Sequence, residues 1–198
     1  MNGIAAILLA AGRSRRMGRC KQLLPLGDTT VIGRCLETLR AGGIDRIVTV
    51  VSPEGERVAE AARFGRSEVA VNCEPDGDMV SSVRSGRDLL PADVAGVLIA
   101  LCDCPLVASE TVRRLAAAHR TSPDNIIQPV YAGRRGHPLL IPRQVLDGLA
   151  PGMTLRDLLR LEPSRVVMIE VNDPGILVDM DTPEDYAAVQ RLAGGQNQ

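Results

Sequence analysis

Apolar, strand-like runs alternate with amphipathic helical stretches along almost the whole chain, and this alternation constrains the fold more than any other feature of the sequence. It predicts an α/β fold with a mostly parallel sheet that helices cover on both faces. The expected strands are residues 4–9, 46–51, 69–72, 96–101, 125–130 and 165–171. The expected helices are residues 30–41, 55–63, 80–90, 109–119, 143–149 and 154–161, and a last helix begins after Asp181-Thr-Pro with Thr182 as its N-cap.

The composition supports one large core. At 198 residues the chain is expected to form a single domain over residues 1–193, with a loose tail at 194–198. Aromatic residues make up only 2%, so the core must be aliphatic, as suits buried parallel strands. The 23 basic and 24 acidic residues nearly balance, which argues against general nucleic-acid or membrane-surface binding. No apolar run approaches the length of a membrane span, and a cytoplasmic protein is expected.

A loop rich in glycine and arginine follows the first expected strand and contains the only lysine of the chain, Lys21. Turn amides, a following helix and concentrated positive charge together favour binding of an anion. The spacing of Gly12 and Gly18 fits neither the Walker A motif nor G-x-G-x-x-G. We interpret the segment as a phosphate-binding loop with Lys21 as a compact point charge; the alternative is that the lysine falls there by chance. The loop also contains the cations Arg13, Arg15, Arg16 and Arg19.

Acidic residues follow other apolar segments. Asp103 stands after the run at 96–101, and Asp179 and Asp181 follow the apolar segment 175–178, which is interpreted as another strand end. Ligands of open α/β sheets collect at the carboxyl ends of strands, so these carboxylates and the basic loop are expected to form a site for phosphate and Mg²⁺. Of these two carboxylates, Asp181 is preferred as the metal ligand because it opens the Asp-Thr-Pro-Glu turn, and Asp179 is the second choice. The alternative for each aspartate is a purely turn-forming role.

Two more segments are candidates for substrate contact. His137 lies in a segment with two glycines, two arginines and a His-Pro step, although a structural histidine is equally compatible. Ser81 and Ser82 stand near a helix start, where they either line a pocket or cap the helix. His119, near the end of a helix, is interpreted as complementing the helix dipole.

The five cysteines are odd in number and lack the spacing of a zinc site. Cys102 and Cys104 flank Asp103, so a redox or soft-metal role for this pair is one alternative. Reduced, partly buried thiols are the favoured interpretation.

Together these segments resemble the MobA-like nucleotidyltransferase superfamily, and most of all its molybdenum cofactor cytidylyltransferases. The first segment below is the highly specific one, and the set covers nearly the whole chain. The segments are Leu9-Ala-Ala-Gly-x-Ser-x-Arg-Met-Gly-x-x-Lys21-x-Leu-Leu-Pro-Leu26, Gly77-x-Met-x-Ser-Ser-Val-Arg84, Asp103-x-Pro-Leu106, Gly136-His-Pro138, Met153-Thr-x-Arg-x-Leu-Leu159 and Asp179-x-Asp-Thr-Pro-Glu-Asp185.

The resemblance implies a Rossmann-like three-layer α/β/α sandwich of the nucleotide-diphospho-sugar transferase type. It also implies transfer of CMP from CTP to the phosphate of molybdopterin, with Mg²⁺ as cofactor and release of pyrophosphate. A molybdenum hydroxylase or dehydrogenase that receives the cofactor is an expected partner. The implied catalytic residues are Lys21, Arg16 and Asp103, and the implied metal ligands are Asp103 and Asp181. The implied nucleotide-binding residues are Leu9, Ala10, Ala11, Gly12, Arg13, Ser14, Arg15, Arg16, Met17, Gly18 and Lys21. The implied acceptor-binding residues are Ser81, Ser82, Arg84, Gly136 and His137.

The sequence departs from the pattern at two places. Cys102-Asp103 stands where the family usually has Gly-Asp, and Ala10-Ala11-Gly12 replaces the Gly-Gly pair of guanylyltransferase relatives. The second departure favours CTP over GTP by resemblance alone. Three rival functions are a guanylyltransferase for the same cofactor, a nucleotidyltransferase for a sugar or polyol phosphate, and a non-catalytic carrier of the cofactor.

Overall fold

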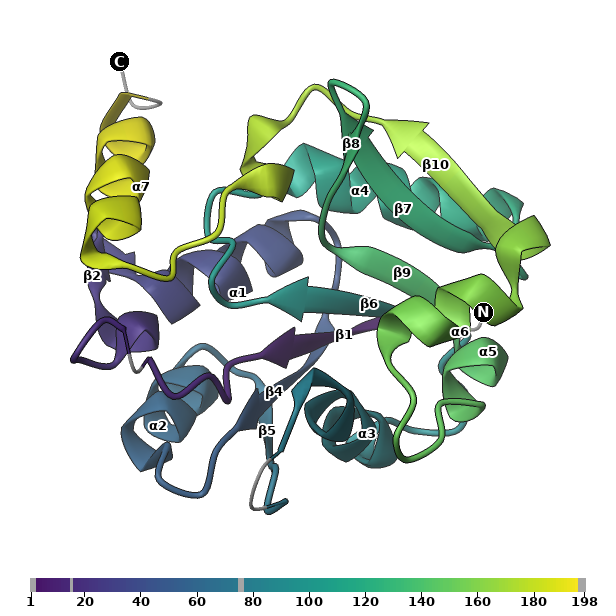
Figure 1. Cartoon of the computed structure of the whole chain (residues 1–198), viewed down its shortest axis with the longest axis horizontal. Helices are drawn as coiled ribbons and strands as arrows, with labels where there is room; N and C mark the ends of the chain where they lie inside the picture. Colours follow the sequence, from purple (N-terminus) through teal and green to yellow (C-terminus); the bar gives the residue numbers. More distant parts are fainter. Residues whose placement is uncertain (1–2, 15, 75–76, 196–198) are drawn as a thin grey trace.

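The first expected strand forms β1 (Ile4–Leu9), in the middle of the main sheet of the computed structural model, which describes residues 3–14, 16–74 and 77–195. β1 pairs in parallel with β6 (Gly96–Leu101) on one side and β4 (Arg46–Val51) on the other. β5 (Glu68–Val71) pairs in parallel with β4, and the order across the sheet is β10-β7-β9-β6-β1-β4-β5. The carboxyl ends of β1 and β6 therefore lie at the same edge of the sheet (Figure 1).

An antiparallel strand interrupts the other half of the sheet. β9 (Leu139–Pro142) lies between β6 and β7 (Ile126–Tyr131) and runs antiparallel to both. β10 (Val166–Glu170) pairs in parallel with β7 at the edge, and the short β8 (Arg134–Arg135) folds back along the end of β7. The sheet is mixed but mostly parallel, which confirms the expected fold class.

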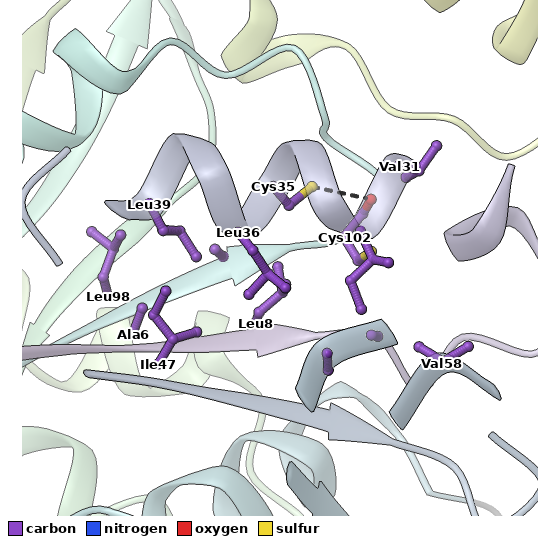
Figure 2. Packing of buried hydrophobic residues seen from close by; sticks show 14 of the residues in the cluster. Ala6, Leu8, Val31, Cys35, Leu36, Leu39, Ile47, Val58, Leu98 and Cys102 are labelled. Carbon is purple, nitrogen blue, oxygen red and sulfur yellow. Dashed lines mark hydrogen bonds between the residues drawn. The ribbon is translucent and has the colours of Figure 1, made fainter. Parts of the chain in front are cut away.

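Helices cover both faces of the sheet and make three layers (Figure 1). Alternate residues of each strand supply the two cores, so that Leu8 packs on one face and Ile7 on the other. Figure 2 shows Leu36 of the first helix lying over Leu8, while Leu39 lies towards Ala6. The first face carries α1 (Val31–Ala41), α2 (Glu56–Phe64), α4 (Ser109–Thr121) and α7 (Pro183–Gly195), and the second carries α3 (Met79–Leu89), α5 (Arg143–Asp147) and α6 (Leu155–Leu161).

The expected elements are present with small shifts at their ends. The longest shifts are at α4, which continues to Thr121, and at α5, which already ends at Asp147. The strand β9 and a small ribbon of β2 (Pro25–Leu26) with β3 (Thr29–Thr30) were not expected from the sequence. No helix in the described part of the chain is both long and apolar enough to cross a membrane.

Three expectations about local structure need correction. The apolar segment before Asp179 forms a 3₁₀ helix, Pro174–Leu177, and not the end of a strand. The basic loop leads directly into a 3₁₀ helix, Lys21–Leu23, and not into the α-helix expected after a phosphate-binding loop. Helix α7 continues through Gly195, so the first two residues of the expected tail at 194–198 are helical, and the other three lie outside the described residues.

His119 is buried in the packing of α4. The residue is only 3% exposed, and neither ring nitrogen has a hydrogen-bond partner among the described residues. Burial lowers the pKa of this imidazole, and the carboxylate of Asp124 opposes that effect only in part. The expected interaction with the helix dipole would need a charged imidazolium, which this environment disfavours.

Replacing His119 with leucine is expected to reduce the acid sensitivity of the fold. The unfolded chain takes up a proton on His119 at about pH 6.5, but the folded chain does so only at lower pH. Stability is therefore retained above this pH and declines as the pH falls towards the lowered pKa. Urea unfolding at about pH 7 and about pH 5 should show a smaller decline for His119→Leu than for the wild type. Parallel declines in the two proteins would contradict this account.

Candidate active site

The ammonium group of Lys21 lies between the carboxylates of Asp103 and Asp181. Its Nζ donates to Asp103 Oδ2 at 2.9 Å, to Asp181 Oδ1 at 2.9 Å and to the carbonyl oxygen of Met180 at 3.1 Å. These contacts use all three donors of the ammonium. Lys21 is 7% exposed, whereas both carboxylates are partly open to solvent. Three residues far apart in the sequence thus form one charged cluster.

A different element positions each residue of the cluster. Lys21 begins the 3₁₀ helix after the basic loop, and Asp103 lies in the turn directly after β6. Asp181 precedes α7, in a segment that lies beside the loop following β1 (Figure 1). Thr182 Oγ1 accepts a hydrogen bond from the backbone N–H of Asp185, while Asp185 Oδ2 accepts from the backbone N–H groups of Asp181 and Thr182. This reciprocal cap confirms Thr182 as the N-cap and fixes the backbone at Asp181.

The charges of the cluster stabilise one another. Burial opposes the charge on Lys21, but attraction to Asp103 and hydrogen bonds with both carboxylates raise its pKa above the usual value. The hydrogen bond from Lys21 lowers the pKa of Asp181, with a smaller contribution from Arg16. Arg16 Nη2 donates to Asp181 Oδ2 at 2.7 Å, and its side chain is 70% exposed. Lys21 is therefore a cation and Asp181 an anion at neutral pH, with Arg16 on the solvent side.

A buried glutamine, Gln22, organises the basic loop from within. Its Nε2 donates to the carbonyl oxygens of Ala10 at 3.0 Å and Gly12 at 2.8 Å, and its Oε1 accepts from Ser14 Oγ at 3.3 Å. Ser14 Oγ in turn accepts from the backbone N–H of Lys21 at 3.1 Å. Gln22 was not predicted from the sequence, and the available signal was a polar residue inside the apolar turn after Lys21.

The remaining residues of the loop lie in different environments. Ala10 and Met17 are buried in the core, and the backbone N–H of Ala10 donates to the carbonyl oxygen of Val50. The guanidinium of Arg19 lies 6.0 Å from the ring centre of Tyr186. Arg15 lies outside the described residues. Leu9, Ala11 and Ser14 are partly buried, and Gly12, Arg13, Arg16 and Gly18 are exposed.

Ser81 and Ser82 point into the protein at the start of α3. Asn72 Nδ2 donates to Ser81 Oγ at 2.8 Å and to Ser82 Oγ at 3.0 Å. Arg84 on the same helix lies 3.6 Å from Glu74. The two hydroxyls therefore tie α3 to the end of β5, and Asn72 is a second organising residue that was not predicted from the sequence.

Gly136 and His137 pack against the 3₁₀ helix Pro174–Leu177. A Cβ atom on Gly136 would lie only 2.4 Å from the carbonyl oxygen of Ile176, so the close approach of the two segments requires glycine. Burial lowers the pKa of His137, and the nearby carboxylate of Asp103 acts in the opposite direction. Its Nδ1 is buried and has no hydrogen-bond partner among the described residues. His137 is thus a neutral imidazole beside Asp103.

The cysteines near Asp103 are protonated thiols. All five cysteines of the chain are free, and Cys102 and Cys104 are buried. The neighbouring thiol of Cys35 and burial raise the pKa of Cys102, and burial followed by the charge of Asp103 raises the pKa of Cys104. Cys35 Sγ donates to the carbonyl oxygen of Cys102 at 3.6 Å (Figure 2). These environments favour structural thiols over a reactive pair.

The carboxylates of Asp103 and Asp181 fit the donor set of Mg²⁺. Both place an oxygen 2.9 Å from one point, the Nζ of Lys21, and carboxylate oxygen is the preferred ligand of this ion. Among the described residues, no three histidine, cysteine, aspartate or glutamate side chains gather into a closed metal cage. An ion held by two carboxylates and completed by substrate oxygens is the usual arrangement for Mg²⁺. Asp179 is exposed and does not contact Lys21 in the described structure.

Two hollows are lined by candidate residues outside the charged cluster, and neither wall includes Lys21, Asp103 or Asp181. One, of about 630 Å³, lies between the basic loop at Gly12 and Gly18 and the turn at Ser52 and Gly55 that leads into α2. The other, of about 1140 Å³, has His137 in its wall and lies on the sheet face that carries α3 and α6. Both volumes are in or just above the range of small-molecule sites.

Solved structures share this fold over its full length. A nucleotidyl transferase from Methanothermobacter is 25% identical, with a TM-score of 0.85 over 99% of this chain and 100% of that chain. Rv0371c from Mycobacterium tuberculosis is 30% identical, with a TM-score of 0.77 over 96% of this chain and 98% of that one, and it has also been solved in a complex with manganese. The protein therefore has the fold of the nucleotide-diphospho-sugar transferases.

The profile of the family described as "MobA-like NTP transferase domain" matches residues 6–166, and the chain belongs to that family. It is a nucleotidyltransferase. The matched range includes Lys21, Asp103 and His137 but ends before Asp181.

Full-length relatives carry different names. A molybdenum cofactor guanylyltransferase from Mesorhizobium japonicum is 32% identical over 203 residues, which is 96% of this chain and 95% of the relative. A nicotine blue oxidoreductase from Paenarthrobacter nicotinovorans is 31% identical over 193 residues, which is 91% of this chain and 93% of the relative. The relatives thus share the family and the length of this chain but not one substrate.

Proposed function

We propose that the protein transfers CMP from CTP to the phosphate of molybdopterin, releases pyrophosphate and uses Mg²⁺. The observation that carries this proposal is the cluster of Lys21, Asp103, Asp181 and Arg16, which joins two cations and two carboxylates at one edge of the sheet. Phosphoryl transfer relies mainly on positioning and on neutralisation of charge, and this cluster supplies both.

The hollow beside the basic loop supports binding of the nucleotide. Gly12 and Gly18 leave its wall free of side-chain bulk, and the loop arginines make its rim positive. Arg16, exposed and hydrogen-bonded to Asp181, would contact the phosphates from the solvent side. Lys21 would hold the two carboxylates in fixed relative positions. It would also place a positive charge close to the phosphorus that is transferred.

Asp103 and Asp181 are the residues that would hold the metal. When bound, Mg²⁺ supplies neutralisation of the charge on the phosphate oxygens. The acceptor phosphate needs no strong general base, because a phosphate monoester is already largely anionic near neutral pH. Its oxygen forms a bond to the α-phosphorus of CTP, the bond between the α-phosphorus and the bridging oxygen breaks, and pyrophosphate leaves. The neutral His137 is consistent with a role in binding the acceptor.

CTP is favoured over GTP because Ala10-Ala11-Gly12 lacks the Gly-Gly pair of guanylyltransferase relatives. Two relatives are named molybdenum cofactor guanylyltransferase. Their names support the same cofactor as acceptor but favour GTP, not CTP, as the nucleotide donor. Two further rival functions are transfer to a sugar or polyol phosphate and non-catalytic carriage of the cofactor. The charged cluster argues against a carrier, which has no need of a site for a triphosphate and a metal.

Calorimetric titration with CTP, GTP, ATP and UTP, each with and without Mg²⁺, tests the donor. Mg²⁺-dependent preference for CTP supports the proposal, and preference for GTP replaces it with guanylyl transfer. Absence of binding for every nucleotide would favour the carrier. Pyrophosphate release is then measured with CTP and molybdopterin, and release with a hexose phosphate alone would indicate a sugar-phosphate enzyme.

His137→Ala is expected to weaken binding of the acceptor more than binding of the nucleotide. His137 lies in the wall of the groove under α3 and α6, whereas the hollow beside the basic loop does not include it. The KM for the acceptor should rise by about tenfold, as for the loss of one buried hydrogen bond, with little change in the KM for CTP. Equal changes in the two KM values would assign His137 a structural role.

A further inference from the structure

A large groove crosses the sheet face between the start of α3 and helix α6. Its floor is formed by β7, β9 and β10, through Gln128, Leu139, Val166 and Met168. In Figure 1 the strands β7, β9 and β10 lie away from the loop that follows β1. The groove shares no lining residue with the hollow beside the basic loop and is distinct from it.

Gln128 is a polar residue in a floor that is otherwise apolar. It stands in the middle of β7 between apolar neighbours on the same strand, and it pairs with Met168 of β10. The residue is 8% exposed, and its Oε1 has no hydrogen-bond partner among the described residues. A buried amide without a partner costs about 1–3 kcal/mol, so an apolar residue would stabilise the fold better at this position. A hydrogen bond to a bound ligand would explain why glutamine occupies this position.

His137, which also lines this groove, carries a second unpartnered polar atom. Its Nδ1 is buried and has no hydrogen-bond partner in the described part of the chain. The two orphaned atoms come from β7 and from the segment between β8 and β9, which fold back on each other through the pairing of β7 with β8. The same imidazole lies close enough to Asp103 to feel its charge. His137 is therefore the groove residue that lies within electrostatic range of the charged cluster.

The rest of the groove is apolar with a basic border. Leu139, Leu155 and Val166 offer flat aliphatic contact, while Arg135, Arg156 and Arg160 stand exposed around it. A flat ring would pack on the aliphatic side chains, and the arginines would attract anionic substituents or stack on the ring. This combination suits a planar, polar heterocycle better than a flexible polyol, which would need polar groups along its whole length.

We propose that Gln128, together with His137, determines acceptor specificity by hydrogen bonding to the edge of a planar heterocycle that carries a neighbouring donor and acceptor, such as a lactam. This rests on the proposed function, because it assigns the acceptor of that reaction to the groove. A primary amide presents one N–H donor beside one carbonyl acceptor, which matches the lactam edge in a two-bond pair. A chain of hydroxyl groups makes no such paired edge.

The proposal is tested with pterin-6-carboxylate, a fluorescent bicycle with a lactam edge, and with 2-naphthoate, an anionic bicycle of similar size without one. The wild type and the variants Gln128→Leu and Gln128→Glu are titrated with both compounds. Saturable binding of the pterin should weaken by about tenfold or more in Gln128→Leu, because the side chain is nearly isosteric but can form no hydrogen bond. Gln128→Glu should also weaken binding of the pterin, because a carboxylate lacks the N–H donor of the amide. Binding of 2-naphthoate should not weaken in Gln128→Leu.

The affinity of each variant for CTP with Mg²⁺ is measured in parallel. This measurement distinguishes failure of the inference about the groove from failure of the proposed nucleotide chemistry. Equal effects of Gln128→Leu on the pterin and on 2-naphthoate, or no effect on either, would overturn the role of Gln128. No pterin binding by a wild type that binds CTP would overturn the inference and leave the proposed nucleotide chemistry standing. Pterin binding that depends on Gln128, in a protein that binds no nucleotide, would support the groove and overturn the proposed reaction.

Discussion

Turnover is expected to fall by about 100-fold or more in Lys21→Ala, which corresponds to loss of a charge contact with the transition state. The ammonium of Lys21 lies 2.9 Å from oxygens of both Asp103 and Asp181. Its removal would eliminate the cation that the proposed reaction places near the transferred phosphorus, and it would leave Asp103 and Asp181 without the ammonium between them, with only Arg16 still paired to Asp181. Single-turnover measurement of pyrophosphate release at saturating CTP and acceptor gives the rate of the chemical step.

Two controls distinguish lost chemistry from a damaged fold. Lys21→Arg keeps the charge but changes its shape, so it should retain more activity than Lys21→Ala. Arg63→Ala removes an exposed cation that pairs with Glu56 on α2, and it should leave the rate unchanged. Thermal melts of all three variants report folding. A folded Lys21→Ala protein with a near wild-type rate would exclude Lys21 from the chemistry.

Asp103→Asn is expected to raise the Mg²⁺ concentration needed for half-maximal activity by about tenfold or more, because a neutral amide would replace one of the two proposed anionic ligands. Asp103 reaches the same point as Asp181, in the turn at the carboxyl end of β6. Asp181→Asn should have a comparable effect. The measurement is a titration of activity with Mg²⁺, repeated with Mn²⁺ because a relative of this fold has been solved with manganese.

Asp88→Asn is the matched control for this titration. Asp88 is an exposed carboxylate at the far end of α3, where it pairs with Arg87, so its replacement should leave the Mg²⁺ dependence unchanged. Asp179→Asn tests the other candidate ligand, which is exposed and should matter less than Asp181. An unchanged Mg²⁺ titration for Asp103→Asn would remove Asp103 from the metal site.

The sequence predicted the layers of the fold because buried parallel strands and amphipathic helices have distinct periods. It did not predict β9, because three apolar residues between two prolines carry no period and the strand is inserted from a later part of the chain. The prediction for the apolar segment before Asp179 was wrong for a related reason, since a short apolar run is compatible with a strand or with the 3₁₀ helix that forms there.

The sequence also predicted which charged residues belong to the candidate site, but not the contacts between them. Lys21, Asp103 and Asp181 were all singled out, yet the ammonium was expected in an open phosphate-binding loop and is in fact buried between the two carboxylates. Gln22 and Asn72 were missed because each acts through hydrogen bonds to distant backbone or side-chain atoms, which leave no local pattern. Gln128 was missed because its unusual character depends on burial, which only the fold reveals.

The burial of Lys21 has a practical consequence, because the chain contains no other lysine. Lysine labelled with ¹⁵N at the ζ position would give one side-chain amine resonance, and that resonance belongs to the charged cluster. Exchange of the ammonium from aspartate oxygens to phosphate oxygens would change its chemical shift and the exchange rate of its protons. A single isotopic label therefore turns this side chain into a spectroscopic reporter of nucleotide and metal binding.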